Sequence, residues 1–228
     1  MDRAEPIVFY FDYLSSNAYL AWARLPALAA AYGRPLELEP VLFAGLLDAH
    51  GQLGPAEIPA KAWWTWRNNL RKAALLGIPL RPPAFHPFRP LLSLRVSCLP
   101  MEENRRRALV DGLFRAAWAE SRDLGDPDVV ADVARAGGLD GAALVAAANE
   151  PEAKARLRAR TDAAIAAGVF GVPSMRVGRE LFWGYDDLPY LELHLAGRDP
   201  IPPAPEAPPA RPPASAVRRR VRARDGAR

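Results

Sequence analysis

The chain has 228 residues, of which half are hydrophobic and a quarter are charged, a composition typical of a globular protein. Its formal net charge is +4, but residues 200–228 hold seven arginines and only two acidic residues, a net charge of +5. The remaining 199 residues therefore sum to −1, which argues against a nucleic-acid-binding domain and leaves only the tail as a candidate tether to nucleic acid or an acidic surface.

The few cysteines and histidines exclude several classes of protein. Cys98 is the single cysteine, so an intramolecular disulfide, a CxxC redox pair and a cysteine-rich metal site are all excluded. The three histidines lie far apart and show no HxxxH or HExxH spacing, so no metal site is expected. No run of about 18 apolar residues predicts a membrane span, and the charged start of the chain does not resemble a signal peptide. We therefore expect a cytoplasmic enzyme.

The first elements predict a parallel β-α-β unit. Residues 6–12 form a β-branched and aromatic run typical of a buried strand. Apolar residues at helical spacing predict one helix over 18–32, with Gly33 at its end. Residues 36–41 alternate like a second strand, and the connection is long enough for a parallel crossover.

Residues 43–168 change in character and predict an all-helical block. Alanine- and leucine-rich stretches with helical periodicity predict five long helices, at about 57–77, 101–121, 126–137, 139–149 and 151–167. A block of this size would have room for a second hydrophobic core. The default ligand site would then be a cleft between this block and the strands.

Strands return after the helical block. Residues 171–177 and 180–183 flank the two-residue loop 178–179, which predicts a hairpin. Two aspartates then open a last helix at 187–196, where an acidic first turn suits the helix dipole.

This order of elements predicts an α/β fold of the thioredoxin type with a large all-helical insertion. We expect a thioredoxin-like domain made of residues 5–42 and 169–197, interrupted by a helical insertion domain at 43–168. Eight prolines between residues 200 and 214, followed by arginines, predict a disordered tail at 198–228.

Three groups of residues then resemble one known family. Residues 9–15 read FYFDYLS, 77–80 and 85–91 read GIPL and FHPFRPL, and 169–174 and 181–186 read VFGVPS and LFWGYD. In this order they resemble the 2-hydroxychromene-2-carboxylate isomerases, within the DsbA-like group that includes the kappa-class glutathione transferases. The resemblance implies a glutathione-dependent enzyme.

The resemblance places Ser15 where thioredoxin and DsbA carry the first cysteine of CxxC. It implies that the Ser15 hydroxyl donates a hydrogen bond to the thiolate of bound glutathione and so lowers the pKa of that thiol. Taken alone, Ser15, Ser16 or Asn17 is more typical of a helix N-cap, and neighbouring residues can fill both roles.

The C-terminal signature implies the rest of the glutathione site. In the family the peptide corresponding to Val172-Pro173 is cis, and the Val172 backbone would pair with the cysteinyl residue of glutathione; X–Pro statistics alone favour trans. The γ-glutamyl end would lie at Trp183, Gly184, Tyr185 and Asp186. A helix N-cap is the other interpretation of Asp186.

The sequence departs from the family at several of these positions. Tyr185 stands where the family usually has Asn, Asp187 where it often has Arg, and Ser16 where it has Pro. Contacts made by those family residues are therefore not carried over to this chain.

The substrate site is less defined than the glutathione site. Trp63 and Trp66 fall on one helical face and either line an apolar substrate pocket or pack in the core. Leu47 and residues 57–58 occupy positions that carry charged or polar substrate contacts in the family, so Arg67, Arg71 and Arg89 are candidate replacements.

Two further polar residues, Asp12 and His86, lie close to these motifs. We expect Asp12 to be a structural hydrogen-bond acceptor for nearby backbone N–H groups. His86 lies in a proline-rich loop and receives no role, because a lone histidine is more often structural.

The leading hypothesis is an isomerase that acts on an aromatic-derived 2-oxo acid by reversible addition of the glutathione thiolate. A kappa-class-like transferase that conjugates electrophiles and a non-catalytic DsbA-like binding module are the alternatives. The expected partner is a small aromatic substrate, and a homodimer is left open.

Overall fold

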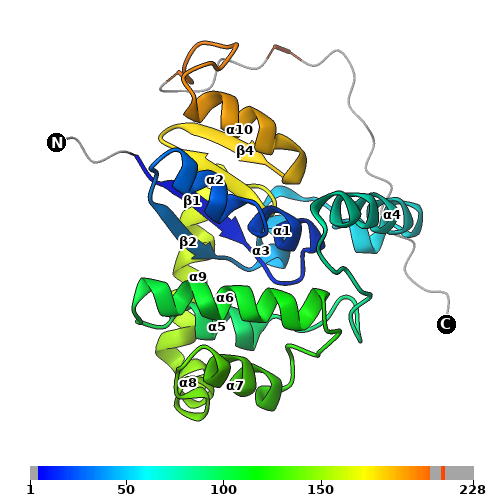
Figure 1. Cartoon of the computed structure of the whole chain (residues 1–228), viewed down its shortest axis with the longest axis vertical. Helices are drawn as coiled ribbons and strands as arrows, with labels where there is room; N and C mark the ends of the chain where they lie inside the picture. Colours follow the sequence, from blue (N-terminus) through cyan, green and yellow to red (C-terminus); the bar gives the residue numbers. More distant parts are fainter. Residues whose placement is uncertain (1–4, 206–211, 214–228) are drawn as a thin grey trace.

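The computed structural model describes residues 5–205 and 212–213 and contains a mixed four-stranded sheet (Figure 1). The strands follow the order β2-β1-β3-β4 and are β1 (Ile7–Phe11), β2 (Leu36–Pro40), β3 (Ser174–Val177) and β4 (Glu180–Trp183). β1 pairs in parallel with β2 and antiparallel with β3, and β3 pairs antiparallel with β4. The predicted β-α-β unit and hairpin are confirmed, and the fold is of the expected α/β thioredoxin type.

The connection between β1 and β2 contains two helices where one was predicted. They are α1 (Ser16–Trp22) and α2 (Leu25–Ala31). Pro26 lies in the first turn of α2 and has no N–H to donate. Its ring also clashes with the carbonyl four residues earlier in a continuous helix, and that residue is Trp22, the last of α1.

The block at 43–168 is helical as predicted. The helices are α3 (Phe43–His50), the 3₁₀ turn η1 (Pro55–Glu57), α4 (Pro59–Leu76), α5 (Leu91–Cys98), α6 (Glu103–Trp118), α7 (Pro127–Ala136), α8 (Gly141–Asn149) and α9 (Pro151–Ala166). Helices α3 and α5 lie within the block that was predicted to be helical, but neither was among the five helices predicted there. Most residues of α5 are buried, so its sequence lacks the polar face that produces a helical pattern.

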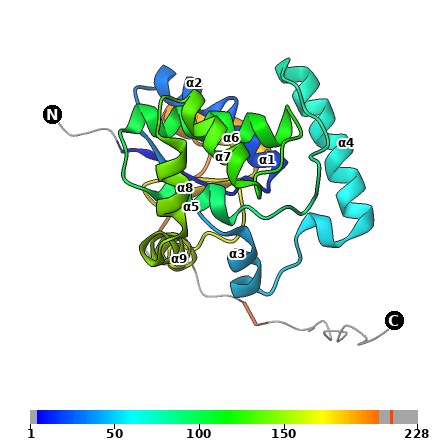
Figure 2. The same cartoon turned by 90° about the horizontal axis from the view of Figure 1, so that it is seen from below.

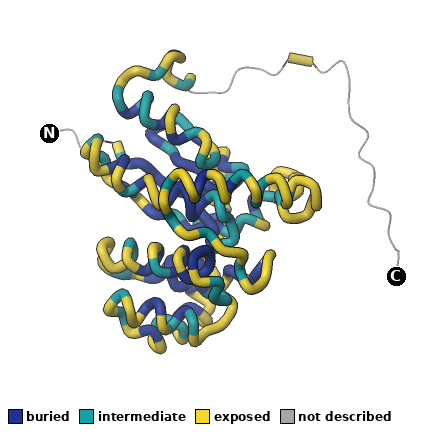
Figure 3. Tube along the Cα trace, turned by 45° about the vertical axis from the view of Figure 1, so that its right-hand side comes forward, coloured by how far each residue is buried: buried dark blue, intermediate teal, exposed yellow. Residues whose placement is uncertain are grey.

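The insertion does not form a separate core. One hydrophobic cluster joins Phe9 and Phe11 of β1 to Phe114 and Trp118 of α6, and the rings of Phe11 and Phe114 lie 5.6 Å apart. Figure 3 shows buried segments both in the sheet and in the helices. The expected second core is therefore wrong, because one face of β1 packs directly on the insertion. The domain boundaries themselves remain a prediction.

A smaller cluster covers the other face of the sheet. Val8 and Tyr10 of β1 pack there with residues that include Leu46 of α3 and Ala164 of α9. Helix α4 lies differently, at the side of the body, where it contacts α1 and η1 (Figure 2).

The C-terminal part of the fold ends in a 3₁₀ turn and a helix. They are η2 (Tyr185–Asp187) and α10 (Leu188–Leu195). The two aspartates belong to η2 and not to the first turn of α10, where they were predicted, because Pro189 occupies that turn.

Most of the predicted tail, 206–211 and 214–228, lies outside the described residues. Its start is bonded to the domain, since the Ala204 N–H donates to the Glu180 carboxylate at 2.5 Å. Within the described part of the chain, no helix has the length and hydropathy needed to cross a membrane.

Candidate functional site

Ser15 begins α1 and faces the second half of the fold. Its Oγ accepts a hydrogen bond from the Ala18 N–H at 3.2 Å, which confirms that it is the N-cap residue. The same hydroxyl lies 3.4 Å from the Val172 carbonyl and donates to it. This second bond is long for an O–H···O contact, so the hydroxyl proton is easily redirected to a better acceptor.

The Val172-Pro173 peptide is cis, as the resemblance implied. Both residues are buried, and they stand between Ser15 and the segment 183–186. The Val172 carbonyl meets Ser15, and the Pro173 carbonyl accepts a hydrogen bond from the Gly184 N–H at 2.8 Å. The fold thus brings together three of the predicted site segments, which lie far apart in the sequence.

The segment after β4 turns sharply at Gly184. Gly184 has a φ of +84°, a region that L side chains rarely adopt, so glycine is required at this turn. The Trp183 N–H donates to the Asp187 carboxylate at 2.8 Å, which ties the turn to η2. Trp183 is half-exposed beside Phe170, and Asp186 is exposed. Asp187 therefore has a structural contact, whereas the Asp186 side chain is 70% exposed.

Lys72 of α4 was missed by the sequence analysis. Its ammonium lies 2.7 Å from Asp186 Oδ2 and 5.1 Å from the centre of the Tyr185 ring, and its side chain is only 9% exposed. The signal for this residue was the helix pattern itself, because Asn69, Lys72 and Ala73 are the buried residues of α4. A lysine and an asparagine on the buried face of a helix require polar partners.

Asn69 connects the same helix to the Ser15 turn. Its Nδ2 donates to Ser16 Oγ at 2.8 Å. Its Oδ1, like the Oδ1 of Asn17, is buried and has no hydrogen-bond partner among the described residues. Two amide oxygens beside the Ser15 turn are thus buried without a partner in the described part of the chain, which is uncommon for buried polar atoms.

The Asp12 side chain binds the backbone next to the Ser15 turn. It is fully buried, and its two carboxylate oxygens accept from the N–H groups of Leu14 at 3.0 Å and Phe43 at 2.9 Å. The predicted structural role is confirmed. Burial raises the pKa of Asp12 to about 6, although the two N–H groups act in the opposite direction.

A pocket of about 310 Å³ opens beside the Ser15 turn. Its wall is largely apolar and consists of Ser16, Pro55, Ala56, Ala62, Thr65, Trp66, Pro82, Pro83, His86 and Trp118. The imidazole of His86 packs edge-on against Trp118 with a ring separation of 5.7 Å, and its Nε2 lies 3.3 Å from the Leu14 carbonyl. The flat aromatic walls match the shape of a planar substrate.

The predicted substrate residues do not all reach this pocket. Trp66 lines it. Trp63 is 64% exposed and lies under the guanidinium of Arg67, 5.9 Å from the ring centre, and neither Trp63 nor Arg89 lines the pocket. The placement of Trp66 follows from α4 packing on α1, which the helical pattern alone did not determine.

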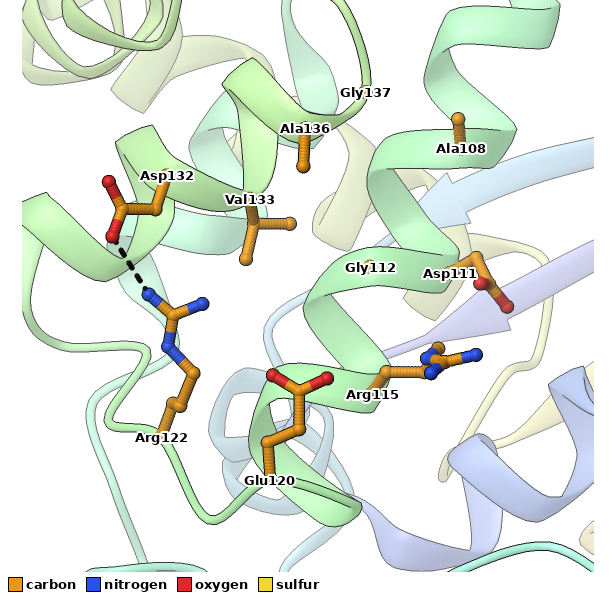
Figure 4. Close-up of a pocket in the computed structure, with 10 residues that line it drawn as sticks. All are labelled: Ala108, Asp111, Gly112, Arg115, Glu120, Arg122, Asp132, Val133, Ala136 and Gly137. Atoms are coloured by element: carbon orange, nitrogen blue, oxygen red, sulfur yellow. Dashed lines mark hydrogen bonds and ion pairs between the residues drawn. The ribbon is translucent and has the colours of Figure 1, made fainter.

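A second hollow, of about 370 Å³, lies between α6 and α7 (Figure 4). Arg122 and Asp132 form an ion pair of 3.0 Å across its rim, and the Glu120 side chain also points into the space between the helices. None of the predicted site residues lines it. The Ser15 turn and its aromatic pocket are therefore the candidate functional site.

Comparison with known proteins agrees with this geometry. The sequence profile of the DSBA-like thioredoxin domain family matches residues 6–196. The chain belongs to this family. A solved DsbA-like structure, that of a 2-hydroxychromene-2-carboxylate isomerase, superposes with a TM-score of 0.78 at 32% identity and covers 84% of this chain and 94% of that one.

Curated members of the DsbA-like family extend the comparison. A 2-hydroxychromene-2-carboxylate isomerase of Pseudomonas putida is 34% identical over 187 residues, which are 81% of this chain and 91% of that protein. Glutathione s-transferase kappa 2 of Caenorhabditis elegans is 28% identical over 211 residues, which are 86% of this chain and 94% of that protein. The relatives of this DsbA-like chain thus carry the names of isomerases and of glutathione transferases.

Proposed function

We propose that the chain is a glutathione-dependent isomerase of the 2-hydroxychromene-2-carboxylate isomerase type. The observation that carries this proposal is that the Ser15 hydroxyl, at the position where the resemblance places the first cysteine of CxxC, caps α1 and faces the cis Val172-Pro173 peptide. The single cysteine, Cys98, cannot replace it, because Cys98 is buried in α5 and burial raises its pKa to about 11. The sulfur must therefore be supplied by a bound thiol.

The residues around Ser15 fit glutathione. When bound, glutathione would supply a thiolate that adds reversibly to the conjugated double bond of the substrate, so that the substrate can rotate about the resulting single bond. The Ser15 hydroxyl would donate its hydrogen bond to the thiolate in place of the Val172 carbonyl. Val172 would offer its backbone to the cysteinyl residue.

The aromatic pocket would hold the substrate, an aromatic-derived 2-oxo acid, against the thiol. Ser16 and Trp66 line one part of it and His86 another, so a planar ring would lie within reach of the Ser15 turn. Holding the two reactants in one site replaces a bimolecular encounter with an oriented reaction.

A pocket-filling variant tests this placement. Ala62 lines the pocket, and Ala62→Trp is expected to raise the KM for 2-hydroxychromene-2-carboxylate by about tenfold or more, because the indole would occupy the substrate space. Glutathione affinity, measured by calorimetry, should change by less than about twofold. Ala74→Trp on an exposed position of the same helix is the matched control. An unchanged KM in Ala62→Trp would place the substrate elsewhere.

A kappa-class-like transferase is the second candidate. The observation that favours it is the absence of lysine and arginine from the residues that line the pocket, so a substrate carboxylate has no cation there. Product analysis separates the two activities, since an isomerase returns glutathione unchanged and a transferase yields a stable thioether. A non-catalytic binding module would give neither product, and titration calorimetry with glutathione would show no heat.

The proposal extends to the setting of the enzyme. We propose that the enzyme works in the cytoplasm, where free glutathione is abundant. A homodimer also remains a proposal, and sedimentation velocity of the full chain tests it. Binding of the tail to nucleic acid is tested by comparing nucleic-acid retention of the full chain with that of a chain ending at residue 205.

A further inference from the structure

We propose that the Ser16 hydroxyl is a second catalytic donor, which stabilises the negative charge that develops on the 2-oxo oxygen of the substrate. This inference rests on the proposed function, in which the substrate is a 2-oxo acid with a conjugated double bond. Ser15 and Ser16 then have different tasks, because Ser15 serves the sulfur and Ser16 serves the substrate. Asn69 of α4 is the positioning residue that orients the Ser16 hydroxyl.

The Ser16 hydroxyl makes one hydrogen bond and has a donor to spare. Its Oγ accepts from Asn69 Nδ2 at 2.8 Å, so its own proton points in another direction. Asn69 is fully buried, and this bond therefore holds the hydroxyl in a fixed orientation. No group in the described part of the chain accepts the Ser16 proton, and Ser16 lines the aromatic pocket. The proton is thus available to an oxygen of a ligand in that pocket.

The pocket offers few other partners for a negative charge. No lysine or arginine is among the residues that line it, and its polar side chains are those of Ser16, Thr65 and His86. The imidazole Nε2 of His86 already faces the Leu14 carbonyl at 3.3 Å. Of the three polar residues, only Ser16 adjoins Ser15 in the chain, and the Cα atoms of consecutive residues lie about 3.8 Å apart. Ser16 is therefore the pocket donor nearest in sequence to the proposed thiol site.

The proposed reaction develops its charge where such a donor can reach it. As the bond between the sulfur and the substrate carbon forms, the electron pair of the C=C bond shifts and the 2-oxo oxygen becomes negative. After rotation about the new single bond the pair returns, the C=C bond forms again and the carbon–sulfur bond breaks, so no electron or proton is consumed. Only two carbons separate the attacked carbon from this oxygen. A hydrogen bond that strengthens as the oxygen becomes negative lowers the barrier.

The competing explanation is that Ser16 only anchors α4 to α1 through Asn69. Loss of the hydroxyl would then lower the stability of the protein without a selective effect on the chemical step. The two explanations differ in which kinetic constant changes, and in whether the effects of substitutions at Ser16 and Asn69 are additive.

The experiment compares turnover of 2-hydroxychromene-2-carboxylate by the full chain and by Ser16→Ala at saturating glutathione. We expect kcat to fall about tenfold or more and KM to change by less than about twofold. Calorimetry should show unchanged affinities for glutathione and for 2-hydroxycinnamate, which keeps the ring and the carboxylate but lacks the 2-oxo group. The ultraviolet absorbance of the thiolate, which reports on Ser15, should titrate as in the unmodified protein.

Further variants separate the chemical role from folding. Ser16→Thr keeps the hydroxyl and should retain kcat within about threefold. Ser16→Pro removes the hydroxyl but suits the first position of α1, so kcat should fall as it does in Ser16→Ala. Asn69→Leu should lower kcat by itself and should have no further effect on kcat in the Ser16→Ala background. The matched control is Ser93→Ala, which removes a buried hydroxyl of α5 outside the pocket and should leave kcat unchanged.

The possible outcomes distinguish this inference from the proposed function. A folded Ser16→Ala with an unchanged kcat overturns the inference and leaves the proposed function standing. A raised KM with an unchanged kcat, or weaker binding of 2-hydroxycinnamate, also overturns it, because Ser16 would then bind the substrate without stabilising the charge. If Asn69→Leu does not fold, the variants at Ser16 decide the test, since Ser16 is only half-buried. An unmodified protein that neither binds glutathione nor isomerises the substrate overturns the proposed function, and this inference with it.

Discussion

Ser15→Gly is expected to raise the pKa of the bound glutathione thiol and to lower turnover by about ten- to a hundredfold. The substitution removes the hydroxyl that would donate to the thiolate, and a hydrogen bond to a charged group contributes about 1.5–3 kcal/mol. Glycine is preferred to alanine here because Ser15 is the N-cap of α1, where glycine costs only a few tenths of a kcal/mol. Ultraviolet absorbance of the thiolate as a function of pH measures the shift.

The control for this variant is Ser15→Thr, which keeps both the hydroxyl and the cap. It should retain a thiol pKa close to that of the unmodified protein, with the melting temperature reporting any loss of fold. If Ser15→Gly leaves the thiolate titration unchanged, Ser15 is a helix cap alone and the sulfur lies elsewhere.

The buried carboxyl of Asp12 is expected to make the protein less stable as pH rises from about 4 to above 6. Burial raises its pKa from the ordinary value of 3.8 to about 6, so between these values the folded chain holds a proton that the unfolded chain has released. The contribution of this group is fully present below pH 3.8 and is lost as pH rises through about 6. The shift corresponds to about 3 kcal/mol.

Asp12→Asn isolates this effect, because asparagine does not titrate. The difference in free energy of unfolding, unmodified protein minus variant, should fall by about 3 kcal/mol between pH 3.5 and pH 7. Other carboxyl groups contribute to both proteins and cancel in the difference. Asparagine offers one acceptor oxygen for the N–H groups of Leu14 and Phe43, so the variant also carries a pH-independent penalty of about 1–3 kcal/mol. Urea unfolding at several pH values is the measurement, and a difference that does not vary with pH would contradict the raised pKa.

The strands and long helices were predictable from local pattern, and the exceptions have local reasons. The strand at 36–41, the hairpin loop at 178–179 and the helix at 151–167 each carry a complete signal in their own residues. The break between α1 and α2 was also encoded locally, by Pro26, but the continuous apolar spacing concealed it. The buried helix α5 lacks a polar face and therefore a pattern.

The candidate site divides in a similar way. Ser15, Val172-Pro173 and Asp186 were found because they stand in recognisable motifs, and the fold confirms that these segments meet. Lys72 and Asn69 stand in no motif, and their importance follows from contacts with residues far away in the chain. Trp63 and Trp66 share a helical face, yet only Trp66 lines the pocket.

The sequence by itself determined the order of the strands and the long helices, a helix cap within residues 15–17 and the lack of any second cysteine that could pair with Cys98. These properties depend on neighbouring residues or on composition, so no knowledge of packing is needed to derive them. The tertiary structure alone decided that the insertion shares one core with the sheet and that α4 brings a buried ammonium to Asp186. The physical reason is that burial and charge pairing depend on distances between residues more than a hundred positions apart, and only the packed chain defines those distances.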